Sequence, residues 1–151
     1  MPTVYAILGE DNTRKSSTIR ALSGAGQHRP MDIQTRAGMI SVYIQISALQ
    51  ESMIQPQAFV QLVAAGRYPN VLVASRIAPL RKRGQLFSSG VAYLAAFAAA
   101  GWAFHQIVLL GTTTPPAGLP RATLPPFPVP QAAIIPANQI AAALRATWSW
   151  L

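Results

Sequence analysis

The residues best suited to chemistry stand together near the start of the chain, from Gly9 to Ser16. A short apolar run from Thr3 to Leu8 precedes them and predicts a buried strand. The residues from Lys15 to Leu22 carry apolar side chains at helical spacing and predict a helix. A glycine, a lysine and a hydroxyl between a strand and a helix are suited to binding phosphate, because the N–H groups at a helix N-terminus favour negative charge.

The segment Gly9-Glu10-Asp11-Asn12-Thr13-Arg14-Lys15-Ser16 matches the pattern G-x-x-x-x-G-K-[ST], with Arg14 in place of the second glycine. Residues 4 to 24 therefore resemble the Walker A region of P-loop NTPases and nucleotide kinases. The resemblance implies ATP or another NTP with Mg²⁺ as the ligand. Lys15 would reach the outer phosphates and Ser16 would hold the metal ion. The residues implied to bind the phosphates are Gly9, Asn12, Thr13, Arg14, Lys15, Ser16 and Ser17.

An alternative interpretation of the same segment involves no ligand. Glu10 and Asp11 are acids that suit the N-terminus of any helix. Arg14 has a Cβ where the backbone of a phosphate loop comes close to its ligand, and it could instead pair with Glu10 or Asp11 and close the loop on itself. A strand–helix turn that has lost its ligand thus remains open beside a working but altered loop.

The resemblance to P-loop NTPases also implies an Asp at the end of another hydrophobic strand, which would hold Mg²⁺ through water. The predicted strands end at Ser47, at Ser75 and before Gly111, and none of these ends is acidic. Glu51 is the only acid near a strand end, where it could support Mg²⁺ or orient water, although a solvated role is the simpler interpretation. We therefore expect weak or absent hydrolysis.

A basic stretch follows the third predicted strand and contains Arg76, Arg81, Lys82 and Arg83. Ligands of doubly wound sheets lie at the carboxyl ends of the strands, so these side chains are candidates for a lid over phosphates. They could equally contact a nucleic-acid backbone. A solvated loop that keeps an apolar protein in solution is the third alternative.

The composition excludes several classes of site. The chain of 151 residues is 51% hydrophobic and 11% charged, with 12 Lys and Arg against 4 Asp and Glu. It has no cysteine and two histidines, so disulfides, thiolate nucleophiles, Cys-ligated zinc and a histidine cage for a metal are excluded. No acid follows Glu51, which excludes a catalytic carboxylate in the remaining hundred residues of the chain.

The remaining pattern predicts one domain over residues 1–151, a three-layer α/β fold with a mostly parallel sheet of about five strands, like that of P-loop NTPases. Residues 27–38 are expected to be a polar connection, and residues 112–130 a proline-rich connection without regular structure. The further strands are expected at 39–47, 71–74, 106–110 and 132–135, and the further helices at 56–65, 88–100 and 139–150.

Two predictions concern the surroundings of the protein. Residues 85–120 carry no charge, but Gly101 and His105-Gln106 interrupt them, so we expect a buried helix and strand and no membrane span. The N-terminus lacks a basic region, which favours a cytoplasmic protein. Trp148, Trp150 and Leu151 form an apolar end that is expected to dock on its own domain or on a second copy in a homo-oligomer.

The function that we expect from the sequence is binding of a nucleotide or another phosphate compound by a variant P-loop. Two alternatives stay open. One is a small-molecule or nucleotide phosphotransferase with the basic stretch at 76–83 as its lid. The other is a non-enzymatic scaffold that binds DNA or a protein partner. Turnover that depends on Mg²⁺ would identify the first alternative, and salt-dependent DNA binding the second.

Overall fold

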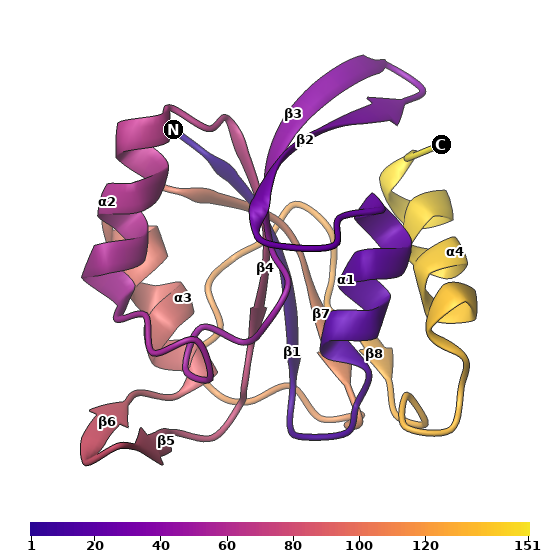
Figure 1. Ribbon diagram of the computed structural model, residues 1–151. Helices are drawn as coiled ribbons and strands as arrows, with labels where there is room; N and C mark the ends of the chain where they lie inside the picture. Colours follow the sequence, from indigo (N-terminus) through magenta and orange to yellow (C-terminus); the bar gives the residue numbers. More distant parts are fainter.

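The computed structural model describes residues 1–151 and is built around a sheet of six strands (Figure 1). These strands are β1 (Thr3–Gly9), β2 (Arg29–Thr35), β3 (Gly38–Gln45), β4 (Asn70–Ser75), β7 (Ala103–Leu110) and β8 (Phe127–Val129). They lie in the order β2-β3-β4-β1-β7-β8, and only the β2–β3 pair is antiparallel. The α/β class and the mostly parallel sheet expected from the sequence are therefore confirmed.

Four helices cover the two faces of this sheet. They are α1 (Lys15–Ser23), α2 (Pro56–Gly66), α3 (Gly90–Ala99) and α4 (Ala137–Trp148). Figure 1 shows α1 and α4 on one face and α2 and α3 on the other. None of these helices has both the length and the hydropathy that crossing a membrane requires.

The apolar residues of β1 explain why the sheet is buried on both faces. Successive side chains of a strand point to opposite faces. Tyr5 and Ile7 accordingly pack with α1 and α4, whereas Val4, Ala6 and Leu8 pack with α2 and α3. Strands buried on both faces are continuous apolar runs in parallel sheets, which is why the sequence identifies β1 and β4 well.

Three parts of the sequence prediction are wrong. Residues 27–38 contain β2, and the proline-rich segment contains β8, while the strand expected at 132–135 is a series of turns. Both unexpected strands lie at the edges of the sheet and contain a proline, Pro30 and Pro128. A proline removes one ladder hydrogen bond, which an edge strand tolerates because one of its sides is unpaired.

The C-terminal aromatic residues dock on their own domain. The rings of Trp148 and Trp150 lie 4.9 and 5.2 Å from the ring of Tyr5 between centroids, and both indoles are buried. Trp148 also donates a hydrogen bond from Nε1 to Gln106 Oε1 at 2.8 Å. These contacts bury the aromatic end within one chain, so its burial does not require a second copy.

The topology creates a crevice beside the end of β1. After β1 the chain enters α1 on one face of the sheet, and after the neighbouring β4 it leads to α3 on the opposite face (Figure 1). Connections that leave adjacent parallel strands in opposite directions open a crevice at their carboxyl ends, where α/β proteins bind ligands. Residues that follow β1 and β4 are therefore brought together there.

Candidate functional site

Gly9 ends β1 at a position with no room for a side chain. An added Cβ would lie 2.5 Å from Thr13 Oγ1 and 3.1 Å from Leu110 Cβ. Gly111, just after β7, is similarly close, since its Cβ would lie 2.9 Å from Thr13 Cγ2. Thr13 is thus buried between two glycines, and this packing fixes the path of the β1–α1 loop, Glu10 to Arg14.

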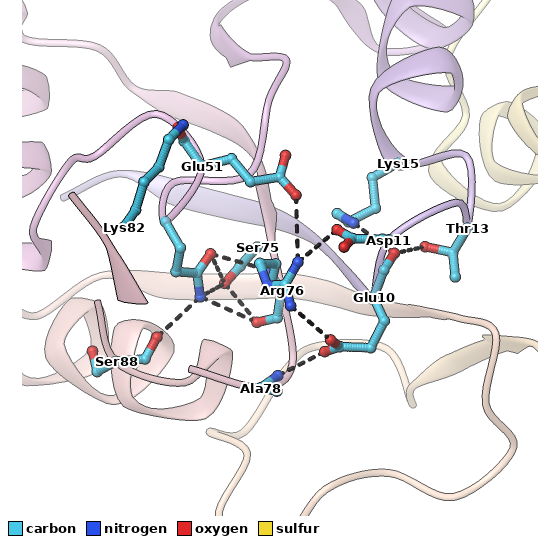
Figure 2. A network of polar contacts seen from close by, with 11 residues as sticks. Glu10, Asp11, Thr13, Lys15, Glu51, Ser75, Arg76, Ala78, Lys82 and Ser88 are labelled. Atoms are coloured by element: carbon cyan, nitrogen blue, oxygen red, sulfur yellow. Dashed lines mark hydrogen bonds and ion pairs between the residues drawn. The ribbon is translucent and has the colours of Figure 1, made fainter. Parts of the chain in front are cut away.

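Two side chains of the site converge on the Glu10 carbonyl. Thr13 donates from Oγ1 at 2.6 Å, and Lys15 donates from Nζ at 2.8 Å (Figure 2). Lys15 is only 6% exposed although it opens α1. Its ammonium group has three donors, and one of them has an acceptor in the protein. The others remain free for oxygen atoms of a ligand.

The backbone of the loop offers a row of free donors. No backbone N–H from Glu10 to Ser17 donates a hydrogen bond within the protein. A cavity of about 410 Å³ lies beside these groups, lined by Asp11 to Ser17 and by Glu51. Unpaired N–H groups at a helix N-terminus carry partial positive charge, so the cavity is suited to an anion.

Burial and charge act in opposite directions on the ammonium group at this cavity. Burial lowers the pKa of Lys15 below its ordinary value, whereas the nearby carboxylates of Glu51 and Asp11 raise it. A cation that has lost part of its hydration gains more from a ligand's negative charge than an exposed lysine does. Lys15 is therefore the side chain on which anion binding at this cavity should depend most.

Arg14 occupies the place of the missing glycine in a glycine-like conformation. Its φ of 66° and ψ of 27° are left-handed, and its side chain is exposed and makes no hydrogen bond or ion pair. An L-residue in this conformation loses about 1–2 kcal/mol relative to the right-handed one. The backbone has thus kept the shape that a glycine would allow, and the side chain forms no ion pair with Glu10 or Asp11.

We expect Arg14→Gly to raise the free energy of unfolding by up to about 1 kcal/mol, because glycine adopts the left-handed conformation without a steric penalty. Arg20→Gly is the matched control. Arg20 is an exposed arginine inside α1, where glycine should lower stability by about 1 kcal/mol. Urea denaturation of both variants measures the difference, and equal losses of stability would contradict the role assigned to the Arg14 backbone.

Arg76, which follows β4, forms all three ion pairs of the structure. Its guanidinium contacts Asp11 at 2.5 Å, Glu10 at 3.4 Å and Glu51 at 3.8 Å (Figure 2). The arginine side chain is only 14% exposed, and its hydrogen bond lowers the pKa of Asp11 below the ordinary value. The alternative that Arg14 pairs with these acids is therefore wrong. Arg76 takes that role and offsets the negative charge beside the loop.

Gln50, a fully buried residue, holds the backbone that carries Arg76. Its Nε2 donates to Ser75 Oγ, to the Arg76 carbonyl and to the Ser88 carbonyl at 2.9–3.2 Å. Its Oε1 accepts from the Arg76 N–H at 3.0 Å and from Ser75 Oγ at 3.2 Å. One amide thus joins the segment after β3 to the segment after β4 and fixes where the guanidinium lies.

The remaining basic residues lie on a hairpin formed by β5 (Leu80–Lys82) and β6 (Gln85–Phe87) at the same edge of the sheet (Figure 1). Lys82 donates from Nζ to the Glu51 carbonyl at 2.6 Å, which ties the hairpin to the wall of the cavity. Arg81 and Arg83 are exposed. Of the four residues considered for a lid, Arg76 is engaged by acids, Lys82 touches the cavity wall, and the two others face solvent.

The oxygen atoms beside the cavity are of the types that bind a hard cation, but too few of them lie together to hold one. Ser16, Asp11 and Glu51 all line the cavity, and Mg²⁺ prefers hydroxyl, carboxylate and phosphate oxygens. No group of three or more His, Cys, Asp or Glu residues is arranged to hold a metal ion. Mg²⁺ would therefore have to bind together with a phosphate ligand, with Ser16 as the protein hydroxyl nearest the helix start.

Three residues that shape the site were not predicted from the sequence. Gln50, Ser75 and Gly111 come from different segments, and each matters through a contact with a distant part of the chain. Gln50 directly precedes Glu51, and Ser75 and Gly111 each follow a predicted strand. Their position near the ends of predicted strands was the one feature of the sequence that could have identified them. It indicates a location, but not which partner a side chain will meet.

A scan of protein-family models and searches of curated proteins and of solved structures find no match to this chain.

Proposed function

We propose that the β1–α1 loop binds the phosphate groups of a nucleotide or a similar phosphate compound, with weak or absent hydrolysis of an NTP. The observation that carries the proposal is the row of free N–H groups from Glu10 to Ser17 beside a cavity that Lys15 also lines. Unsatisfied donors next to a desolvated cation are costly unless an anion or water accepts from them. The resemblance to a Walker A motif independently supports phosphate as the anion.

Each residue of the loop has a defined part in this proposal. Gly9 lets Thr13 pack against the strand, and the backbone from Asn12 to Ser17 supplies the donors that surround the phosphate. Lys15 neutralises its charge, and Ser16 holds Mg²⁺ if the ligand brings it. Arg14 supplies the left-handed turn of the backbone, and it also lines the cavity with an exposed side chain.

We expect weak hydrolysis because of where the carboxylates lie and what they contact. β4 ends at Ser75 and β7 at Leu110, so no acid stands at either neighbour of β1. Asp11 and Glu51 line the cavity, but both contact Arg76, and the hydrogen bond from Arg76 lowers the pKa of Asp11. The site thus lacks a free general base, and binding is the activity that remains.

A phosphotransferase is the second candidate, because Lys82 places the basic hairpin against the cavity wall. Positioning and electrostatic stabilisation supply most of the rate of phosphoryl transfer to a bound acceptor. Turnover of ATP with Mg²⁺ that appears only when an acceptor is added would identify this function.

Lys15→Met is expected to abolish stabilisation by nucleotides while leaving the fold intact, because methionine keeps much of the apolar stem and removes the charge. Thermal unfolding is measured with ATP, ADP and pyrophosphate, each with and without Mg²⁺. A ligand at 100 times its dissociation constant should stabilise the wild type by about 2.7 kcal/mol.

Arg121→Ala serves as the control for this experiment, because it removes one positive charge from an exposed residue in the segment between β7 and β8. The proposal requires that this control keep the full ligand-induced shift. Equal shifts in the wild type and Lys15→Met, or no shift with any phosphate compound, would show that the loop is not a phosphate site.

A further inference from the structure

The β5–β6 hairpin has two distinct faces. The strand register pairs Leu80 with Phe87 and Arg81 with Leu86, and side chains alternate along a strand. Phe87 is fully buried and Lys82 reaches the Glu51 carbonyl, so this face packs on the protein. On the other face Arg81 is exposed, and Leu86 is 54% exposed. The side chain of Arg81 on that outer face therefore does not stabilise the fold through any polar contact.

Three contacts hold the hairpin in place. Besides the Phe87 anchor and the Lys82 hydrogen bond, Gln55 donates from Nε2 to the Leu86 carbonyl at 3.3 Å. The outer face is thus presented from a hairpin secured to the body of the protein. A presented surface loses less conformational entropy on binding than a mobile loop does.

The turn of the hairpin keeps an arginine where the backbone disfavours one. Lys82 pairs with Gln85, so Arg83 and Gly84 form a two-residue turn, with φ values of 51° and 75°. Two left-handed residues are typical of a type I′ turn, in which asparagine and glycine are preferred. Arg83 therefore holds its exposed side chain in a backbone conformation that costs energy.

The charges of the chain are unevenly divided. Three of the four acids contact Arg76, and the fourth, Asp32 on β2, forms no ion pair. Neither Arg81 nor Arg83 forms an ion pair within the structure. A surface of free arginines attracts phosphate oxygens, to which the planar guanidinium bonds well.

We propose that the outer face of the hairpin, formed by Arg81 and Arg83, binds the phosphate backbone of a nucleic acid without regard to sequence. The hairpin carries no exposed aromatic ring on which a base could stack, so its contacts go to phosphates. Nucleic acid fits better than an acidic protein, because phosphates repeat along it at short spacing and two arginines near one turn can contact successive groups. The inference is independent of phosphate binding in the β1–α1 loop.

The test uses the full chain with the double variant Arg81→Gln/Arg83→Asn. Asparagine suits the left-handed position at the turn, so the hairpin is expected to stay folded. Binding to a fluorescein-labelled oligonucleotide of mixed sequence is followed by anisotropy over a range of salt concentrations. The variant should bind several oligonucleotides more weakly by a similar factor. The slope of log K against log salt should fall by about 1.4–1.8, the value for two lost phosphate contacts.

The matched control is Arg36→Gln/Arg121→Gln, which removes two exposed arginines from the β2–β3 turn and from the β7–β8 connection. It should keep most of the affinity and slope. Failure of the wild type to bind at low salt would overturn the proposal. So would an equal loss in the control variant, or displacement of the oligonucleotide by polyaspartate at the same charge concentration, because either result indicates diffuse charge and no defined site.

Discussion

Gln50→Ala is expected to lower the free energy of unfolding by about 2–4 kcal/mol, the largest stability effect of any single polar residue in the site. The substitution removes all hydrogen bonds of a fully buried amide and leaves the Arg76 N–H without its acceptor. A buried donor left unsatisfied costs roughly 1–3 kcal/mol, and the cavity left by the side chain adds to this. Urea denaturation at constant m-value measures the change.

Two further variants separate the hydrogen bonds from the packing of Gln50. Gln50→Met preserves most of the side-chain volume but removes the amide. Its free energy of unfolding should fall nearly as much as that of Gln50→Ala, because the lost hydrogen bonds cause most of the destabilisation. Gln85→Ala removes an exposed glutamine of β6 and should change stability by less than about 0.5 kcal/mol. A Gln50→Met variant as stable as the wild type would show that the amide does not hold the Arg76 segment.

Arg76→Ala should weaken phosphate binding at least about tenfold, a loss of about 1.4 kcal/mol. Without the guanidinium, the carboxylates of Glu10, Asp11 and Glu51 repel each other and any anion in the adjacent cavity. Two unit charges 4 Å apart interact by about 1 kcal/mol in water and by about 4 kcal/mol at a protein surface, so this repulsion is large enough. Calorimetric titration with pyrophosphate measures the change, and Arg121→Ala is the control of equal charge.

Neutralising the acids should restore the phosphate binding that Arg76→Ala weakens. Adding Glu10→Gln and Asp11→Asn removes two of the charges. The amide oxygen introduced at position 10 can still accept from the Ala78 N–H, as the Glu10 carboxylate does at 2.7 Å. Binding should therefore recover in the triple variant. If Arg76→Ala binds pyrophosphate as tightly as the wild type, the guanidinium does not govern the charge of the site.

The same network predicts a change with pH. Arg76 lowers the pKa of Asp11, so the stabilisation from this pair is present above the ordinary carboxyl pKa and is lost as the pH falls through the lowered value. In Arg76→Ala the pKa of Asp11 should rise, which NMR titration of the side-chain carboxyl carbon can follow. An unchanged pKa in the variant would contradict the role of Arg76.

The sequence predicted the central part of the fold because its signals are local. β1, α1 and the loop between them follow from an apolar run, a glycine and helical spacing within a short stretch of chain. The edge strands were missed because each contains a proline and lies in a polar or proline-rich stretch, which predicts a connection. Their pairing depends on neighbours in space, which local patterns do not contain.

The contacts around Arg76 lay beyond prediction for a similar reason. The basic stretch suggested a lid, but the first of its arginines contacts acids that precede it by more than sixty residues. Gln50 likewise acts on a segment twenty-five residues further along the chain. The carboxyl edge of a parallel sheet brings such residues together, so sequence indicates the edge but not the pairs that form on it.

The most direct test of phosphate binding is an NMR titration of the ¹⁵N-labelled protein with pyrophosphate, with and without Mg²⁺. Because the N–H groups from Glu10 to Ser17 donate to no atom of the protein, a phosphate that accepts from them should move these amide signals downfield, together and to saturation. The signals of Arg81 and Arg83 should move little at the same concentration. Amide signals of the loop that stay in place while those of exposed arginines move would contradict the proposal that the β1–α1 loop is a phosphate site.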